Sequence, residues 1–134
     1  MKHLAHTTSL ILLTVFMVSC SNGQNKADGA IAENVNVEEF AKHMQEAQLL
    51  DVRTPGEWNE GIIEGAITAN IYEDDFDQQL EKLDKDKPVA VYCKSGGRSG
   101  QAMSQMHEMG FKEVYNLKGG IGAWNNAAQP TVKP

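Results

Sequence analysis

The sequence predicts a single α/β domain in which a parallel sheet is covered by helices on both faces. Segments with the composition of strands alternate along the chain with segments whose apolar residues recur at helical spacing. Several of the expected strands are apolar throughout, which is typical of parallel strands buried on both faces. The length of 134 residues and the hydrophobic fraction of 41% fit one globular domain.

The first half of the domain begins with a helix. Asn36 and Glu39 have the spacing of a capping box, and apolar residues follow them at helical spacing. The apolar run at residues 49–52 indicates a short buried strand. Thr54 and Pro55 then indicate the start of another helix, because proline is favoured at the first helical position.

The second half continues the alternation of strands and helices. Strands are expected at residues 65–71, 88–92 and 113–117. Helices are expected after Asp75, from Ser99 to Met109 and around Trp124. Reactive loops of parallel sheets lie at the carboxyl ends of strands, and Cys93 directly follows the most apolar of these strands.

The segment before the domain has the pattern of a signal peptide. A positive charge at Lys2 is followed by a short apolar core and by small residues up to Cys20. Residues 17–20 resemble the lipobox of bacterial lipoproteins, and this resemblance implies cleavage before Cys20 and lipidation of its sulfur. A plain secretory signal and an uncleaved anchor are the alternatives. No apolar run approaches the ~20 residues of a membrane-spanning helix.

These features divide the chain into four parts. They are a lipoprotein signal peptide at residues 1–19, a flexible tether at 20–33, the folded domain at 34–128 and a C-terminal tail at 129–134. The tether is expected because the stretch after Cys20 is polar and rich in small residues. The expected location is the bacterial cell envelope, with the domain lipid-anchored and facing the periplasm or the exterior.

The composition excludes some classes of function. The net charge is -6, from 12 Lys and Arg against 18 Asp and Glu. Nucleic acid is therefore not an expected partner, because phosphate binding needs a basic face. Two cysteines are too few for a disulfide framework.

The chemistry is expected in the loop after the strand at residues 88–92. The loop consists of Cys93, Lys94, Ser95, Gly96, Gly97, Arg98 and Ser99. Successive backbone N–H groups and the N-terminus of the next helix can point toward the sulfur, and Lys94 and Arg98 add positive charge. All of these favour a thiolate, so Cys93 is a candidate nucleophile. The alternative is that Cys93 is a small buried hydrophobe.

This loop resembles the active-site loop of the rhodanese (sulfurtransferase) family, in which four residues separate a cysteine from an arginine. Three further segments resemble family signatures in the expected order: residues 49–58, 61–66 and 117–124. The resemblance covers about residues 35–126 and implies a rhodanese-like parallel sheet.

The resemblance also implies a thiosulfate sulfurtransferase-like activity with no metal and no organic cofactor. Cys93 would take sulfur from a small anionic donor such as thiosulfate, carry it as a persulfide, and pass it to a thiol or to cyanide. Arg98 would hold the anionic sulfur. The substrate-binding loop would consist of Lys94, Ser95, Gly96, Gly97 and Ser99. Asp51 would support the site through bonds to neighbouring backbone, and Arg53 would do so by pairing with an acid.

One position departs from the family pattern, which usually has a histidine where Ile62 stands. The other histidines of the domain, His43 and His107, are expected on solvent-exposed helix faces, so no histidine is given a catalytic role. Trp58 and Trp124 are expected in the core rather than in a substrate site.

Two other functions compete with sulfur transfer. Cysteine phosphatases and arsenate reductases use a related loop but generally place five residues between cysteine and arginine, whereas four stand here. A smaller ring suits one sulfur atom better than a tetrahedral oxyanion. The second alternative is a non-enzymatic sulfur carrier or protein-interaction module of the same family, for which Ile62 leaves room.

The lipid anchor can be tested without reference to the domain. We expect Cys20→Ala to release the protein from the membrane fraction of an expressing bacterium, because the variant lacks the sulfur that would carry the lipid. Fractionation followed by immunoblotting measures this, and Cys93→Ser is the control that should stay in the membrane. Retention of the Cys20→Ala protein would instead indicate an uncleaved anchor.

Overall fold

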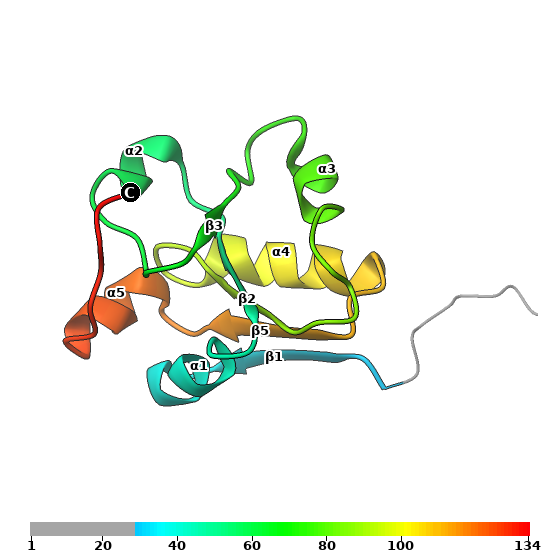
Figure 1. Ribbon diagram of the computed structural model, residues 1–134, viewed down its shortest axis with the longest axis horizontal. Coiled ribbons are helices and arrows are strands. Elements are labelled where there is room, and N and C mark those ends of the chain that lie inside the picture. Colours follow the sequence, from blue (N-terminus) through cyan, green and yellow to red (C-terminus); the bar gives the residue numbers. More distant parts are fainter. Residues whose placement is uncertain (1–28) are drawn as a thin grey trace, which may run out of the picture.

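Five parallel strands form one sheet in the order β1-β5-β4-β2-β3 (Figure 1). The strands are β1 (Ile31–Val35), β2 (Gln48–Asp51), β3 (Ile67–Thr68), β4 (Val89–Tyr92) and β5 (Glu113–Leu117). The helices are α1 (Val37–His43), α2 (Pro55–Trp58), α3 (Phe76–Leu80), α4 (Gly97–Glu108) and α5 (Gly120–Asn126). This computed structural model describes residues 29–134, so the predicted signal peptide and Cys20 lie outside the described residues.

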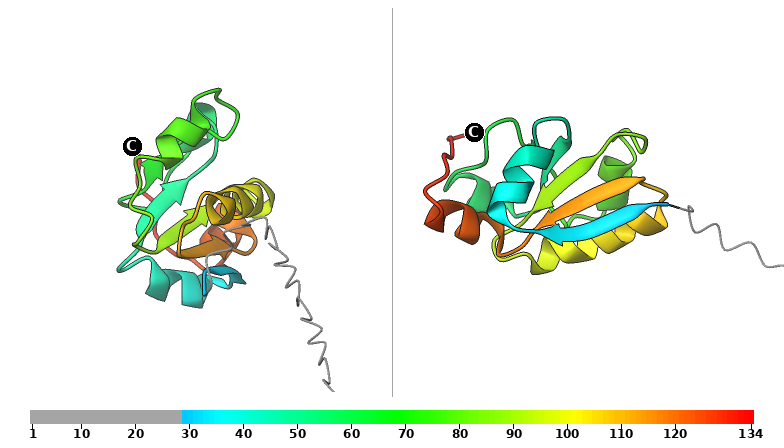
Figure 2. Two further views of the ribbon diagram at one scale, coloured as in Figure 1. Left: turned by 90° about the vertical axis from the view of Figure 1, so that its right-hand side faces the viewer. Right: turned by 90° about the horizontal axis from the view of Figure 1, so that it is seen from below.

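The helices cover both faces of the sheet, as predicted from the apolar strands (Figure 2). Side chains alternate along β4, so Val89 and Val91 face one way and Ala90 and Tyr92 the other. Helices α3 and α4 pack on the face of Val91, and α1 and α5 pack on the face of Tyr92. Because β4 is the middle strand, its carboxyl end is enclosed from both sides. None of the helices among residues 29–134 is long and apolar enough to span a membrane.

The predicted capping box begins α1. The Asn36 side chain accepts from the Glu39 N–H at 2.9 Å, and the Glu39 carboxylate accepts from the Asn36 N–H at 3.2 Å. These two bonds satisfy backbone donors that the first helical turn leaves free. The helix then buries Phe40, whose ring packs edge-on against Tyr92 and Trp124 with centroid distances of 6.4 and 6.2 Å.

The predicted start of the folded domain at residue 34 is wrong. Strand β1 begins at Ile31, inside the predicted tether of residues 20–33, and pairs along its length with β5. Only Val35 of this strand is buried, because β1 lies at the edge of the sheet. An edge strand of this kind needs little apolar sequence, so its pattern resembles that of a polar linker.

The predicted C-terminal tail at residues 129–134 is likewise not free of the domain. Ile62 and Val132 form an antiparallel bridge in which each N–H donates to the other's carbonyl at 2.8 Å. The indole N–H of Trp124 donates to the Pro130 carbonyl at 2.9 Å, and the Lys133 ammonium donates to the Asn59 carbonyl at 2.7 Å. We call residues 130–133 the strap, since they lie across the ends of α2 and α5.

Two element boundaries differ from the prediction. The strand expected at residues 65–71 pairs as β3 over two residues only. Helix α4 begins at Gly97 rather than Ser99, because Gly96 has a left-handed φ of 96° that turns the chain into the helix within one residue. The loop between Cys93 and the helix is correspondingly tighter.

The expectations for histidine and tryptophan hold only in part. Trp124 is 3% exposed and belongs to the core, whereas Trp58 is half-buried at the end of α2. The prediction that both histidines are solvent-exposed is wrong. His43 stacks on the Tyr115 ring at a centroid distance of 3.7 Å, and His107 is half-buried on α4.

The N-terminus of α5 lies directly on the loop that follows β4. The Ile121 N–H donates to the Cys93 carbonyl at 2.8 Å, and the Gly122 N–H donates to the Lys94 carbonyl at 3.2 Å. Gly120 permits this approach: it has a φ of 59°, and a Cβ there would lie 2.4 Å from the Cys93 carbonyl oxygen. Because Gly120 has no side chain, the start of α5 can approach the Cys93 loop closely enough for these two hydrogen bonds to form.

We expect Gly120→Ala to destabilise the fold by about 3 kcal/mol, because both the backbone angle and the clash with loop backbone oppose a side chain. Urea unfolding followed by circular dichroism measures the change. Gly56→Ala is the matched control, since a Cβ at Gly56 meets nothing within 4 Å. That control should be neutral or gain about 0.5–1 kcal/mol from helix propensity, and equal losses in both variants would contradict the interpretation.

Candidate active site

Cys93 lies at the carboxyl end of β4, where the sheet delivers it to the start of a helix. Its side chain is 1% exposed and carries a free thiol. The Gly96 N–H donates to Sγ at 3.1 Å, and the Ser99 hydroxyl donates to Sγ at 3.3 Å. The N-terminus of α4 follows at Gly97, so its partial positive charge adds to these donors. The loop thus forms a cradle of donors around one sulfur atom.

Two opposing effects set the acidity of the thiol. Burial acts to raise the pKa of Cys93, because it disfavours the charged form. Hydrogen bonds from the Ser99 hydroxyl and from backbone N–H groups of Ser95, Gly96 and Ser99 act in the opposite direction. The hydrogen bonds outweigh burial, so the pKa of Cys93 lies below its ordinary value and the thiolate is favoured.

Arg98 makes a contact that the sequence did not predict. Its two terminal nitrogens donate to the two carboxylate oxygens of Glu57 at 2.8 and 2.7 Å, and its guanidinium lies 5.9 Å from the centre of the Tyr72 ring. The expectation that Arg98 holds anionic sulfur differs from this geometry, because the planar fork is occupied by a carboxylate. Its charge still acts on the site, since the negative charge of Cys93 contributes, after Glu57, to the raised pKa of Arg98.

Glu57 is a site residue that the sequence analysis missed. Its carboxylate also accepts from the N–H and hydroxyl of Thr54 at 3.1 and 2.9 Å. The hydrogen bonds from Arg98 are the main cause that lowers the pKa of Glu57 to about 2. The capping-box spacing from Thr54 to Glu57 was the available signal, but it did not show that Glu57 binds a residue of the loop.

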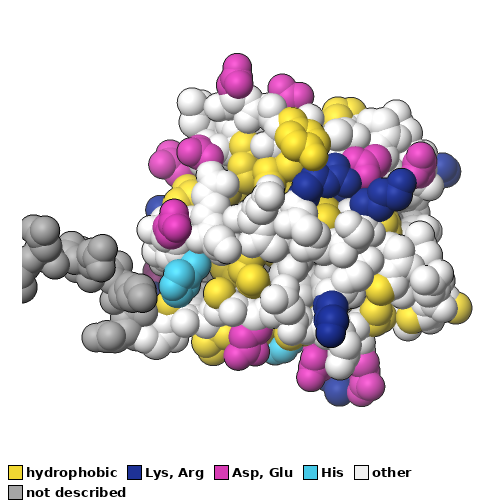
Figure 3. Space-filling view, turned by 180° about the vertical axis from the view of Figure 1, so that it is seen from behind, with side chains coloured by type: hydrophobic (Ala, Val, Ile, Leu, Met, Phe, Trp, Pro, Cys, Tyr) yellow, Lys and Arg dark blue, Asp and Glu magenta, His cyan; other side chains and the backbone are white. Residues whose placement is uncertain are grey.

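On the face shown in Figure 3, basic side chains lie next to exposed hydrophobic and acidic ones.

Asp51 and Arg53 form a buried ion pair at the end of β2, as the family resemblance implied. They are 0% and 2% exposed, and the Arg53 guanidinium donates to the Asp51 carboxylate at 2.6 Å. Asp51 also accepts from the Arg53 backbone N–H at 3.0 Å. The remaining guanidinium donors bind the carbonyls of Glu57 and Gly61 at 3.1 and 2.7 Å. Arg53 therefore fixes both ends of the segment that carries Glu57.

Asn116 is a second residue that the sequence analysis missed. Its side-chain amide donates to the Asn34 side chain at 2.7 Å and to the Gly96 carbonyl at 3.1 Å. It is 2% exposed, and it interrupts the otherwise apolar run of β5. A buried amide in such a strand was the available signal, because buried polar groups need partners. Asn116 therefore ties the Cys93 loop to β5, on which it lies, and to the edge strand β1.

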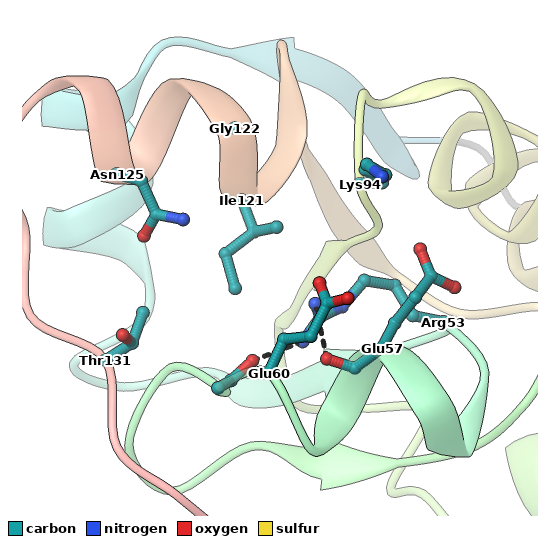
Figure 4. Close-up of a pocket in the computed structure, with 9 residues that line it drawn as sticks. Arg53, Glu57, Glu60, Lys94, Ile121, Gly122, Asn125 and Thr131 are labelled. Carbon is teal, nitrogen blue, oxygen red and sulfur yellow. Dashed lines mark hydrogen bonds between the residues drawn. The ribbon is translucent and has the colours of Figure 1, made fainter.

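A pocket of about 140 Å³ opens beside the loop (Figure 4). It is lined by Arg53, Glu57, Glu60, Gly61, Lys94, Ile121, Gly122, Asn125 and Thr131. These residues come from α2 and the residues on either side of it, from the Cys93 loop, from α5 and from the strap, so only the folded chain brings them together. Of the predicted loop residues, Lys94 and Ser95 are exposed, and Lys94 borders this pocket. Within residues 29–134, no group of three or more His, Cys, Asp or Glu side chains could hold a metal ion.

Comparison with known proteins agrees with this architecture. The family model of the Rhodanese-like domain matches residues 36–127. The chain is 40% identical over 94 residues to the uncharacterized protein YqhL of Bacillus subtilis, which covers 70% of this chain and 73% of the relative. It is 36% identical over 90 residues to a protein of Allochromatium vinosum named Sulfurtransferase. This match covers 67% of this chain and 82% of the relative.

Solved structures show the same fold. The crystal structure of a rhodanese-related protein from Thermoplasma volcanium superposes with a TM-score of 0.69 at 28% identity. The match covers 76% of this chain and 99% of that protein.

The cradle predicts how the thiol responds to loss of one donor. We expect Ser99→Ala to move the pH midpoint of Cys93 alkylation by iodoacetamide upward, because the thiolate loses the Ser99 hydroxyl. The alkylation rate at pH 7 should fall about tenfold, as for a lost charge-assisted hydrogen bond. Ser95→Ala is the matched control, since only the Ser95 backbone N–H supports the sulfur. An unchanged midpoint in Ser99→Ala would contradict the cradle.

Proposed function

Because this chain belongs to the family of rhodanese-like domains, we propose that it transfers sulfane sulfur through a persulfide on Cys93. The donor cradle around Sγ, with Gly96 and Ser99 in hydrogen-bond contact, is the observation that carries this proposal. Such a cradle stabilises negative charge on the Cys93 sulfur. Cys93 carries this charge as the attacking thiolate, and it carries it again when it leaves as a thiolate from the persulfide. The relative named Sulfurtransferase supports the same reaction class.

The first half-reaction takes sulfur from the donor. The Cys93 thiolate attacks the outer sulfur of thiosulfate, a new S–S bond forms, and the donor's own S–S bond breaks. Sulfite leaves with the electron pair of that bond, and the outer sulfur remains on Cys93 as a persulfide. Lys94 is exposed at the loop and supplies positive charge where an anionic donor approaches.

The second half-reaction discharges the persulfide to an acceptor. Cyanide or a thiolate attacks the outer sulfur, and Cys93 leaves as a thiolate that the Gly96 N–H and the Ser99 hydroxyl stabilise. Cys93 is the free cysteine of residues 29–134, so no second thiol within that part of the chain can resolve the persulfide as a disulfide. The acceptor therefore comes from outside the domain.

Arg98 contributes through position and charge. Its pairing with Glu57 links the N-terminus of α4 to α2, and this link holds the cradle closed around the sulfur. Glu57 also offsets much of the Arg98 charge, so Lys94 is the cation of the loop that remains unpaired among the described residues. The proposed location in the cell envelope rests on residues 1–20, outside the described residues.

Sulfite release from purified Cys20→Ser protein tests the proposal, since Cys93 is then the sole thiol. Thiosulfate alone should release at most one equivalent of sulfite per chain, and the intact mass should rise by one sulfur atom. Added cyanide should restore continuous turnover with ping-pong kinetics. Cys93→Ser should release no sulfite while keeping the circular dichroism spectrum of the folded protein. Sustained release from thiosulfate alone in thiol-free buffer, or release by the Cys93→Ser protein, would refute the persulfide mechanism.

A further inference from the structure

The pocket beside the Cys93 loop contains two charged side chains that no ion pair among residues 29–134 compensates. Four charged residues line it, namely Arg53, Glu57, Glu60 and Lys94. Arg53 is paired with Asp51 and Glu57 is paired with Arg98, so their charges are compensated from outside the pocket. Among residues 29–134, neither the Glu60 carboxylate nor the Lys94 ammonium has an ion-pair partner. The pocket therefore presents one free anion and one free cation.

The rest of the lining suits a small polar molecule. In Figure 4 the Glu60 side chain points into the space between α2 and α5, below Ile121. Ile121 supplies an apolar surface, and Asn125 and Thr131 supply side chains that can donate and accept hydrogen bonds. A volume of about 140 Å³ has room for a few heavy atoms rather than for a peptide.

The strap makes this pocket a built feature of the fold. Thr131 lies between Pro130 and Val132, whose carbonyls accept from the Trp124 indole and from the Ile62 N–H. The Lys133 ammonium binds the carbonyls of Asn59 and Glu60 at 2.7 and 3.2 Å. These contacts hold the strap beside the residue that carries the free carboxylate.

The pocket is also connected to the reactive loop. Ile121 and Gly122 line it, and their N–H groups bind the carbonyls of Cys93 and Lys94 at 2.8 and 3.2 Å. Lys94 itself is both a pocket residue and the neighbour of the nucleophile. A molecule seated in the pocket therefore lies next to the loop that would carry the persulfide.

We propose that this pocket binds the sulfur acceptor and that it selects small aminothiols, with the ammonium of the acceptor paired to Glu60. This inference rests on the proposed function, which supplies the persulfide that the acceptor attacks. An acceptor that also has a carboxylate, such as cysteine, places that group toward Lys94. Ile121 packs against the methylene groups that separate the amine from the sulfur.

The transfer balances without a further reactant. The acceptor's thiolate sulfur attacks the outer sulfur of the Cys93 persulfide, and a new S–S bond forms on the acceptor. The bond between the outer sulfur and Cys93 breaks, and its electron pair stays on Cys93 as a thiolate. The outer sulfur takes up a proton from water after sulfite has left, and it keeps this proton during the transfer, so the product is the protonated persulfide of the acceptor.

Steady-state kinetics with matched acceptors test the inference on the full-length chain with Cys20→Ser. In ping-pong kinetics, kcat/KM for the acceptor reports the second half-reaction and kcat/KM for thiosulfate reports the first. Glu60→Gln should lower kcat/KM for cysteamine about fivefold, as expected for a charge pair with an exposed carboxylate. The same variant should leave kcat/KM unchanged for 2-mercaptoethanol, for cyanide and for thiosulfate. Glu64→Gln, an exposed acid outside the pocket lining, is the matched control and should change none of these values.

The outcomes separate this inference from the proposed function. An equal loss for cysteamine and 2-mercaptoethanol, or no loss for either, would overturn the selection of aminothiols while sulfite release still supports sulfur transfer. If the Cys20→Ser protein with no substitution in the pocket did not release stoichiometric sulfite, the proposed function itself would be overturned. A loss for cysteamine alone, reproduced by Glu60→Ala and absent in Glu64→Gln, would establish Glu60 as a specificity-determining residue.

Discussion

The buried ion pair between Arg53 and Asp51 is the interaction on which the rim of the candidate active site depends. The Arg53 guanidinium also donates to the carbonyls of Glu57 and Gly61. These bonds hold α2 and the residues that follow it in place. Glu57 in turn binds Arg98 at the start of α4, and Gly61 precedes the residue that bridges to the strap. A buried charge must keep its partners, because an unpaired one is strongly unfavourable. The loop, the pocket and the strap are therefore linked to a single internal contact.

The acidity of the Cys93 thiol depends on a second balance, between burial and hydrogen bonding. Burial protects the sulfur but opposes its ionisation, and the donors of the cradle reverse that opposition. The cradle in turn depends on close backbone packing, since Gly120 lets α5 touch the loop and Asn116 holds the Gly96 carbonyl. Acidity of the thiol is thus a result of tertiary packing as much as of the loop sequence.

Ile62 stands at the position where the family resemblance implies a histidine, and the structure shows how the fold uses it. The side chain is 8% exposed, and its backbone forms both hydrogen bonds of the bridge to Val132. The position therefore contributes packing and strap attachment rather than a titratable group. In the mechanism we propose, sulfur transfer accordingly relies on the cradle around Cys93 and on the charges of Lys94, Glu57 and Arg98.

The sequence alone determined the features that depend on near neighbours. The apolar strands, the capping boxes and the Cys93 loop each follow from residues a few positions apart, because helix and strand periodicity are local properties. Tertiary structure decided the contacts between distant residues. Arg98 and Glu57 are 41 positions apart, and Asn116 and Asn34 are 82 apart. Strand β1 and the strap have too little apolar sequence to be predicted from the sequence. They fold because the backbone groups of β5 and of Ile62 provide hydrogen-bond partners for them.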